Sequence, residues 1–408
     1  MKSQRIAIIG GGIGGLSAAL ALTKAGFSVQ VFEQAPELTE VGAGIQLSPN
    51  ATQILQHWGL YQDAKRIGFL PKAIKFSHWR SGEQIGRFPI NHSELFHHSS
   101  YMHIHRADLH ELLYRRFLDL NPDGLVTGAK LQQVEYDAQA KTSRLSFESA
   151  TPAGIKGSED TFNVVVGADG IHSKVREMVA PHSQARFTGN VAWRGLVPTD
   201  ELSPSCRPDP CANVVMGPGA HFVCYYVRGG KTLNYVAVVE RDDWQEESWT
   251  IKASHEEMME DFSGWNAQIR DILGSTAPDS CYRWALHDRE PLKHWHKDQC
   301  LLIGDAAHPM LPFLAQGAAM ALEDAFVLAT CFTRHADASA EAIKQFVSLR
   351  QARATRVQLE ARKNMKIYHM RNPLIQFARD QYLFFLSNTR PEYFNRRLQW
   401  LYSYDLCS

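Results

Sequence analysis

A glycine-rich turn near residue 10 constrains the fold of this chain more than any other feature. Apolar residues over 6–9 lead into Gly10, Gly12 and Gly15, which fit the pattern G-x-G-x-x-G, and a helical run follows over 17–22. In such a strand–turn–helix unit the first glycine forms the tight turn and the second lets the backbone approach a pyrophosphate. The third lets the helix pack closely on the strand. The pattern predicts a phosphate site at the N-terminus of this helix.

A second strand supports a ligand at this turn. Gly26 ends the predicted helix, and the run over 28–33 ends at Glu33, close to the expected ~20 residues after the turn. An acid at that place binds a ribose hydroxyl. A glycine-rich turn without a ligand is the alternative. Because strand, helix, second strand and terminal acid are all present, the sequence predicts a bound dinucleotide.

Composition and charge restrict the class of protein. At 408 residues the chain exceeds the usual size of a single core, so two domains are expected. Hydrophobic residues make up 44%, and 43 basic residues balance 43 acidic ones, so neither nucleic acid nor an anionic membrane is an expected partner. No apolar run reaches the ~18 residues of a membrane span, and the first strand starts too early to leave room for a signal peptide. Seven cysteines without a C-x-x-C pair favour reduced thiols, a cytoplasmic location and no metal site.

Two later motifs distinguish FAD from NAD. Residues 161–176 contain an apolar strand that ends in Asp169-Gly170, and residues 300–309 contain another that ends in Gly304-Asp305. Carboxylates at the carboxyl ends of parallel strands point into the crevice where ligands bind. NAD does not need a second acidic strand end so far along the chain, whereas FAD extends a ribityl chain and an isoalloxazine beyond its adenosine half. No His or Cys stands at an obvious attachment point, so non-covalent FAD is expected.

These three motifs, in this order and spacing, resemble those of the single-component FAD-dependent aromatic hydroxylases typified by 4-hydroxybenzoate hydroxylase. Within that family the chain is most similar to the salicylate and 3-hydroxybenzoate hydroxylases, and 6-hydroxynicotinate monooxygenase is also near. The resemblance covers nearly the whole chain, including the ending from Trp400 to Asp405. It implies an α/β fold with a Rossmann-like FAD-binding domain, an antiparallel-sheet substrate domain over the flavin, and a C-terminal helical segment.

The same resemblance implies that the chain crosses between the domains several times. Alternating apolar residues over 191–197 and 221–227 predict antiparallel strands, and the turn 228–231 predicts a hairpin. The expected FAD-binding domain comprises 1–75, 101–178 and 286–340, the substrate domain 76–100 and 179–285, and the C-terminal helical region 341–408.

Several segments match cofactor contacts of that family. Arg106 stands in the segment whose arginine reaches FAD, and Leu131 matches a contact on the adenine side. Gly44 and Ile45 belong to the loop over 41–50, which resembles the loop beside the isoalloxazine. The resemblance assigns Asp305 to the ribityl region and Asp169-Gly170 to the cofactor cleft, with a helix N-cap as the alternative for Asp169. The predicted cofactor-binding residues are Gly10, Gly12, Ile13, Gly14, Gly15, Glu33, Gly44, Ile45, Arg106, Leu131, Asp169, Gly170, Gly304, Asp305, Pro312, Gly317 and Ala318.

A second helix start is expected beside the flavin. The run after Pro312 becomes strongly helical near Gly317. Its free N–H groups would face the flavin N1 and C2 carbonyl, where negative charge gathers on reduction. Some relatives have glycine where this chain has Ala315, a small departure that bears on the mobility of the loop.

His221 and Tyr225 are the predicted catalytic pair. They are four residues apart in a predicted strand, so both side chains point to one face. The resemblance implies that this face lies toward the ring hydroxyl, because 3-hydroxybenzoate and 6-hydroxynicotinate members carry a His and a Tyr at this spacing. A histidine of ordinary pKa, about 6.5, accepts a phenolic proton at neutral pH. A sheet histidine bonded to backbone is the alternative, and His308 is expected to be structural.

The implied activity is hydroxylation of a small hydroxylated aromatic acid of the salicylate or 3-hydroxybenzoate type. NAD(P)H, a transient co-substrate without a second G-x-G-x-x-G, would reduce the FAD, and O2 would then form a flavin C4a-hydroperoxide. Alternatives of the same fold act on an N-heteroaromatic such as 6-hydroxynicotinate, a quinone or a polyketide-like substrate, and an alternative of another class is a flavin-binding sensor or scaffold without turnover. The sequence leaves open the aromatic acid, loss of its carboxylate, NADH or NADPH, and monomer or homodimer.

Overall fold

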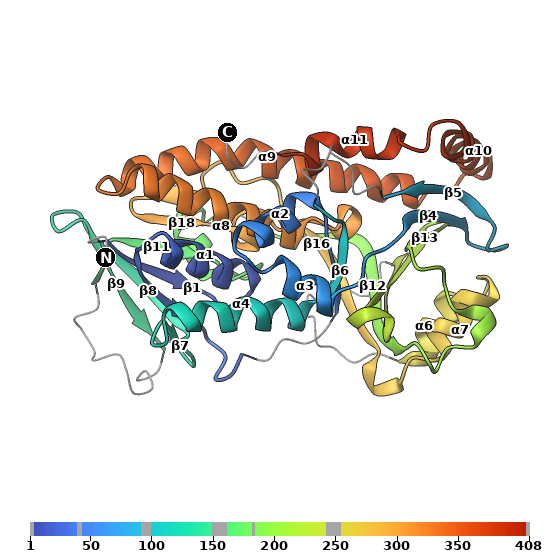
Figure 1. Cartoon of the computed structure of the whole chain (residues 1–408), viewed down its shortest axis with the longest axis horizontal. Helices are drawn as coiled ribbons and strands as arrows, with labels where there is room; N and C mark the ends of the chain where they lie inside the picture. Colours follow the sequence, from blue (N-terminus) through green and yellow to red (C-terminus); the bar gives the residue numbers. More distant parts are fainter. Residues whose placement is uncertain are drawn as a thin grey trace.

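Two large β-sheets lie side by side and are covered by helices (Figure 1). The computed structural model describes residues 4–38, 43–90, 99–148, 161–181, 184–241 and 254–404. A six-stranded sheet carries the glycine turn at the end of its central strand. A seven-stranded sheet carries His221 and Tyr225.

The six-stranded sheet is built from short strands, and its inner strands are mostly apolar. β1 (Arg5–Ile9) pairs in parallel with β2 (Ser28–Phe32) and β11 (Val164–Gly167), and β18 (Cys300–Leu302) pairs in parallel with β11. β1 and β11 are buried almost throughout, as parallel strands with covered faces are. The full order is β17 (His296–Lys297), β18, β11, β1, β2 and β7 (Leu125–Val126). Because β1, β11 and β18 run in parallel, the three motifs that follow them meet at one edge of this sheet.

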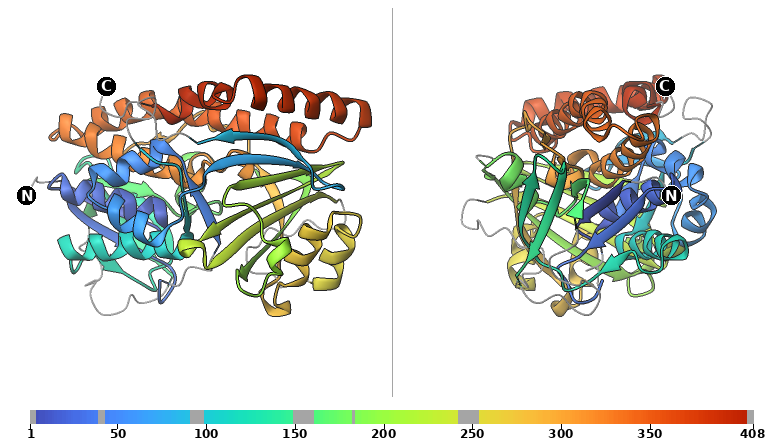
Figure 2. Two further views of the ribbon diagram at one scale, coloured as in Figure 1. Left: turned by 45° about the vertical axis from the view of Figure 1, so that its right-hand side comes forward. Right: turned by 90° about the vertical axis from the view of Figure 1, so that its left-hand side faces the viewer.

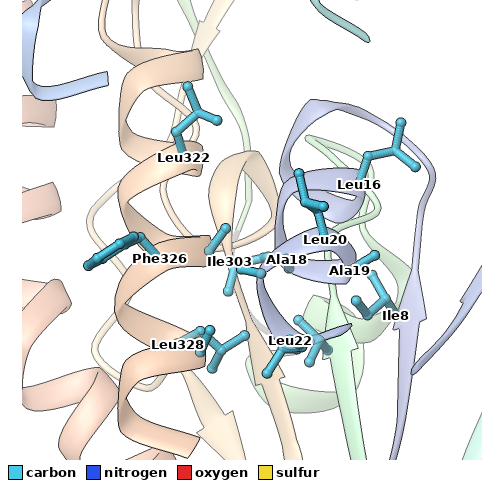
Figure 3. Close-up of a cluster of buried hydrophobic side chains, with 14 of the residues drawn as sticks. Ile8, Leu16, Ala18, Ala19, Leu20, Leu22, Ile303, Leu322, Phe326 and Leu328 are labelled. Atoms are coloured by element: carbon cyan, nitrogen blue, oxygen red, sulfur yellow. The ribbon is translucent and has the colours of Figure 1, made fainter. Parts of the chain in front are cut away.

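Helices pack around this sheet through small and branched apolar side chains. α1 (Ile13–Lys24) contacts both α4 (Arg106–Leu120) and α8 (Gly317–Arg334). Figure 3 shows Ala18 and Leu22 of α1 facing Leu328 of α8, with Ile303 between the two helices, and all four side chains are fully buried. α9 (Ser339–Tyr368) lies along α8 and continues toward the second sheet (Figure 1).

The seven-stranded sheet is mostly antiparallel. Its order is β16 (Tyr282–Asp288), β12 (Arg186–Pro198), β15 (Thr232–Glu240), β14 (Ala220–Val227), β13 (Ala212–Gly217), β4 (Ala73–His78) and β5 (Gln84–Pro89). Only the pair of β13 and β4 is parallel among the described strands of this sheet. The predicted hairpin is confirmed, since β14 and β15 are joined by a turn in which Arg228, Gly229 and Gly230 have positive φ. The prediction that residues after 76 join this sheet is also confirmed by β4 and β5.

Smaller elements complete the structure. A two-stranded sheet of β3 (Gly44–Leu47) and β6 (Met102–His105) contacts β14, and β3 also contacts α8, so it lies between the two large sheets. A three-stranded sheet consists of β10 (Thr161–Phe162), β9 (Thr142–Phe147) and β8 (Leu131–Asp137). The other α-helices are α2 (Pro49–His57), α3 (Tyr61–Ile67), α5 (Lys174–Val179), α6 (His255–Asp261), α7 (Ala267–Gly274), α10 (Pro373–Thr389) and α11 (Tyr393–Tyr402). Short 3-10 turns are η2 (Pro204–Cys206), η3 (Arg228–Gly230), η4 (Pro278–Ser280), η5 (Gly304–Ala306) and η6 (Pro312–Leu314).

The α/β fold class predicted from the sequence is confirmed, including the long helices after residue 341, which lie along one side of both sheets (Figure 2). The exact domain boundaries stay a prediction. Val41 and Gly42 of the predicted flavin loop, and Asp405 of the C-terminal ending, lie outside the described residues. Within the described ranges, no helix combines the length and the apolar character that crossing a membrane requires.

Candidate active site

A cavity of about 710 Å³ lies between the two large sheets. Residues of the glycine turn line one part of it, and residues of β12, β14, β15 and β16 line another. This volume falls within the ~300–1,000 Å³ typical of small-molecule and cofactor sites. The cavity therefore connects the predicted dinucleotide site with the predicted catalytic strand.

The glycine turn shapes one wall of the cavity. Gly10 has a φ of +104°, which glycine adopts without strain, and a Cβ at Gly15 would lie 1.9 Å from the carbonyl oxygen of Gly10. A Cβ at Gly12 would meet no atom within 4 Å, and Gly12 lines the cavity as the N-cap of α1. Gly15 therefore packs the helix against the turn, while Gly12 leaves room for a ligand at the helix N-terminus.

Glu33 lies beside this turn as the sequence predicts. Its carboxylate accepts hydrogen bonds from the backbone N–H of Gly11, at 2.6 Å, and of Ala35, at 2.8 Å. Glu33 also lines the cavity. The side chain is thus fixed by the loop that it faces, and a ribose hydroxyl at Glu33 stays a prediction.

Asp169 lies at the cavity wall, beside the N-terminus of α5. Its carboxylate accepts hydrogen bonds from Ser173 Oγ, from the backbone N–H of Lys174 at 2.7 Å and from that of Val175 at 3.2 Å. Burial raises the pKa of this carboxyl group, although these hydrogen bonds act in the opposite direction. The N-cap that the sequence left as an alternative for Asp169 is instead Ser173, whose hydroxyl accepts from the backbone N–H of Arg176. Asp169 supports this helix start, and Asp169 and Gly170 both line the cavity.

The turn that carries Asp305 is held from two sides. Arg176 donates to the carbonyl oxygens of Asp305, at 3.3 Å, and Ala306, at 3.2 Å. Asp324, fully buried in α8, accepts from the backbone N–H of Gly304 at 2.9 Å. Asp305 itself is exposed at the cavity wall. The backbone of this turn is therefore positioned while its carboxylate stays available to a ligand.

The N-terminus of α8 faces the cavity where the sequence predicts it. Gln316, Gly317 and Ala318 line the cavity, and a Cβ at Gly317 would meet no atom within 4 Å. Ala315, just before the helix, has a φ of +52° and a ψ of +40°, the left-handed conformation that costs an L-residue roughly 1–2 kcal/mol. The turn is thus held in a strained form by its surroundings, with the helix dipole directed at the cavity.

His221 and Tyr225 face the same cavity from β14. His221 Nδ1 lies 2.7 Å from His369 Nε2, and the rings of Phe313 and Tyr368 lie 5.2 Å from the His221 ring. Burial, followed by the neighbouring His369, holds the pKa of His221 well below its ordinary value. Burial likewise raises the pKa of the Tyr225 phenol. Both side chains are therefore neutral at pH 7, with His221 in its proton-accepting form.

The structure gathers almost all of the predicted site residues around one cavity. Both members of the predicted catalytic pair line it, and so do all the predicted cofactor-binding residues except Gly15, which lies under the turn. His308, expected to be structural, is buried with Nε2 2.6 Å from Asp324 Oδ2. Their roles toward a cofactor or substrate stay predictions.

Sequence reasoning missed the groups that polarise and support the site. Arg194 lines the cavity from β12, over the ring of Trp284 at 5.4 Å, and its charge lowers the pKa of Tyr225 against the effect of burial. An arginine inside an apolar alternating strand was the available signal. Asp324 had a signal too, since an acidic pair, Glu323 and Asp324, interrupts an otherwise apolar helix. Their partner Arg350, buried in α9, could not be paired with them from the sequence.

Comparisons with known proteins agree with this site. Residues 3–361 match the model of a protein family described as FAD binding domain. A 3-amino-4-hydroxybenzoate 2-monooxygenase of Streptomyces cremeus is 37% identical over 371 residues, which cover 90% of this chain and 89% of that protein. A 6-hydroxynicotinate 3-monooxygenase of Bordetella bronchiseptica is 33% identical, with 93% of this chain and 96% of that protein covered. A 3-hydroxybenzoate 6-hydroxylase of Polaromonas naphthalenivorans is 33% identical, with 98% and 96% covered.

Solved structures show the same similarity in three dimensions. HpxO of Klebsiella pneumoniae, in complex with FAD and uric acid, superposes with a TM-score of 0.84 at 25% identity and covers 99% of this chain and 98% of its own. A salicylate hydroxylase substrate complex superposes with a TM-score of 0.80 at 27% identity, with 99% and 96% covered. These similarities confirm the resemblance inferred from the three motifs.

Proposed function

The chain belongs to the FAD-dependent aromatic monooxygenases, and on that premise we propose that it hydroxylates a small aromatic acid with a ring hydroxyl, using NAD(P)H and O2. The observation that carries this proposal is the single cavity that joins the glycine turn to His221 and Tyr225. A cofactor seated on the turns of the six-stranded sheet can reach, within this cavity, a substrate held against β14.

The residues present fit FAD. Gly12 and Gly317 leave open space at the N-termini of α1 and α8, so backbone N–H groups can approach the pyrophosphate and the flavin. We assign Glu33 to the adenosine ribose and Asp305 to the ribityl chain, because both line the cavity beside these turns. FAD supplies hydride acceptance from NAD(P)H and an electrophilic oxygen atom from O2. The protein contributes binding, orientation, exclusion of water and control of protons.

We assign His221 to the removal of the substrate's phenolic proton. Its depressed pKa keeps the ring neutral at pH 7, so it can accept a proton, and a phenolate attacks an electrophilic oxygen far better than a phenol does. Tyr225, neutral as well, is suited to donate a hydrogen bond to the same ring oxygen. Trp284 lines the cavity and offers a flat face to a planar ring, while the rings of Phe313 and Tyr368, 5.2 Å from the His221 ring, hold His221 in place.

The position of Arg194 favours a substrate that carries a carboxylate. It lies on the cavity wall near Tyr225, and an arginine in a partly desolvated site attracts an anion. The three relatives are named for substrates that each combine a ring hydroxyl with a carboxylate. The N-heteroaromatic acid 6-hydroxynicotinate is therefore a second candidate beside salicylate and 3-hydroxybenzoate.

A panel of aromatic acids tests the proposal. NADH and NADPH consumption by the FAD-loaded protein is followed with salicylate, 3-hydroxybenzoate, 4-hydroxybenzoate and 6-hydroxynicotinate, and products are identified by mass. We expect at least one acid to stimulate consumption and to yield a product with one added oxygen, or with a hydroxyl in place of the carboxylate. Benzoate, which lacks the hydroxyl, is the matched control. Failure of every hydroxylated acid, with FAD bound, would contradict the proposed substrate class.

A further inference from the structure

His221 does not end the polar path that begins in the cavity. Its Nδ1 lies 2.7 Å from Nε2 of His369, and both rings are buried. His369 stands at the C-terminal end of α9, 148 residues away in the sequence. A nitrogen-to-nitrogen distance this short between two imidazoles requires one ring to donate and the other to accept a hydrogen bond.

His369 leads onward to a carboxylate. Its Nδ1 lies 3.4 Å from Oε1 of Glu240, the last residue of β15, and the Glu240 side chain is about one-third exposed at 32%. Arg371, 69% exposed, donates to Glu240 Oε2 at 2.7 Å. Backbone hydrogen bonds fix the geometry, since Gly219 N–H donates to the carbonyl of His369 and Glu240 N–H donates to the carbonyl of Gly219. The order from cavity to surface is therefore His221, His369, Glu240.

We propose that His369 and Glu240 form a proton path that carries the substrate's phenolic proton from His221 out of the cavity. The proposal rests on the proposed function. The substrate O–H bond breaks and its proton binds His221 Nε2, while the proton on His221 Nδ1 passes to His369 Nε2. The proton on His369 Nδ1 passes to the Glu240 carboxylate and from there to water. No electron is transferred, and the proton returns by the same path when the product hydroxyl is re-formed, which restores both imidazole tautomers.

The surroundings favour transfer over trapping of the proton. Burial, offset in part by Glu240, lowers the pKa of His369 to about 4, so neither imidazole holds a proton for long at neutral pH. Tyr368, whose pKa burial raises to about 12, faces His221 from α9, and Tyr225 and Arg194 line the same cavity. Arg371 is the cation beside Glu240. A carboxylate at the outer end is thus the one anionic group among these described neighbours, and it draws the proton outward.

The path makes His369 and Glu240 positioning residues that act through His221. His369→Gln keeps a polar side chain but cannot relay a proton, and Glu240→Gln removes the outer acceptor, whereas Glu240→Asp keeps a carboxylate. The matched controls are His335→Gln, at the end of α8 beside Gln345, and Glu290→Gln, which pairs with Arg362. Neither His335 nor Glu290 belongs to the path.

The decisive readout is the dependence of the hydroxylation rate on the D2O fraction, with the acid that the panel identifies. Wild type should show a curved dependence on the D2O fraction, because several protons move together. His369→Gln should show a linear dependence. Its hydroxylation should slow roughly tenfold, which is less than the ~10²–10⁴ expected for a lost general base. FAD content and NAD(P)H-driven reduction should match wild type. Glu240→Gln should slow hydroxylation less, Glu240→Asp should restore most of it, and the controls should behave as wild type.

A second measurement is independent of turnover. 3-Hydroxy-4-nitrobenzoate is a phenol whose absorption reports its ionisation, so a jump to higher pH with this probe bound measures proton release from the cavity. We expect slower release in His369→Gln than in wild type at equal probe affinity. Wild-type release and a wild-type D2O dependence in His369→Gln would overturn the proton path while leaving the proposed function intact. A wild type that hydroxylates no acid of the panel would instead contradict the proposed function itself.

Discussion

His221 combines two properties that a base in a flavoenzyme needs, namely access to the cavity and a neutral ring at physiological pH. The sequence could predict its face from the four-residue spacing with Tyr225, because side chains alternate along a strand. It could not predict the depressed pKa, which arises from burial and from His369, a residue far away in the sequence. The strand pattern therefore identifies the residue, and the packing of α9 against it determines its protonation.

Replacement of His221 tests the base. In His221→Ala, FAD binding and NAD(P)H-driven reduction should persist, while hydroxylation slows by ~10²–10⁴ and more reducing equivalents end as H2O2. Because the pKa of His221 lies below its ordinary value, the base is active above that pKa and protonated below it. The wild-type rate should therefore fall only at a pH well under 6.5, and this acid limb should be absent in the variant. Unchanged product per NAD(P)H consumed in His221→Ala would make His221 structural.

Ala315 offers a test of backbone strain at the cavity wall. Its left-handed conformation costs an L-residue about 1–2 kcal/mol, which glycine avoids, although glycine also makes the unfolded chain more flexible by about 0.4–1 kcal/mol. Ala315→Gly should leave the Tm unchanged or raise it slightly, and Ala315→Val should lower it because a β-branched residue fits this region worse. Thermal unfolding of the FAD-loaded proteins measures both. A clear loss of stability in Ala315→Gly would show that the turn is not strained.

At the scale of elements, α8 organises the site from two directions. Its N-terminus faces the cavity, and about two turns further Glu323 and Asp324 hold Asn50, Gly304 and Arg350 in a buried network. The sequence could predict the start of α8 from the loop before Gly317 and the helical run after it. It could not predict the network, because its members come from α2, the turn after β18 and α9. The position of the Asp305 turn thus depends on contacts between elements.

Replacing two acidic residues, Asp324 and Asp305, separates support of the fold from contact with the cofactor. Asp324→Asn removes the buried anion beside His308 and one of the two buried carboxylates that pair with Arg350, and it should destabilise the fold by about 3–5 kcal/mol. Asp305→Ala, at an exposed carboxylate, should leave the Tm of the FAD-free protein near that of wild type but abolish retention of FAD. Chemical unfolding and flavin content after gel filtration measure the two effects. Full retention of FAD in Asp305→Ala would contradict its assignment to the ribityl chain.

The pH dependence of stability follows from the same network. Burial raises the pKa of Asp324, but His308 and Arg350 outweigh it and bring the value to about 2. A carboxylate whose folded pKa lies below its unfolded value of about 3.9 stabilises the protein above that value, and the stabilisation is lost as the pH falls toward 2. The stability of wild type should fall over this window, and Asp324→Asn should lack this part of the fall.

At the scale of the whole molecule, the cavity is made by two sheets that the chain builds in alternation. The three FAD motifs meet because parallel strands bring their carboxyl ends together, so this half of the site was predictable from the sequence. The position of β14 relative to these turns could not be predicted from the sequence, since it depends on β3 and β6 between the sheets and on α9 across them. Trp284 was missed for the same reason, whereas Arg194 had a signal in its apolar strand, although that signal did not show which cavity it lines. Ligand binding is therefore expected to stabilise both sheets together.

FAD should accordingly raise the stability of the whole chain. The protein should be yellow as purified and release free FAD on heating or acid treatment. A ligand at 100 times its Kd adds about 2.7 kcal/mol, so FAD-loaded protein should unfold at a higher Tm than FAD-free protein, in one transition. The comparison of calorimetric scans with and without FAD measures this. A colourless protein that cannot be reconstituted would contradict the account of the cavity.

The origin of the oxygen atom in the product distinguishes oxygen transfer within the cavity from unproductive oxidation of NAD(P)H. The FAD-loaded protein is supplied with NAD(P)H, ¹⁸O2 and the aromatic acid that stimulates consumption, and the product is analysed by mass spectrometry. A monooxygenase that transfers oxygen within this cavity should give a hydroxylated product carrying one ¹⁸O atom per molecule formed. Consumption of NAD(P)H that yields only H2O2, or a product whose new oxygen comes from water, would contradict it.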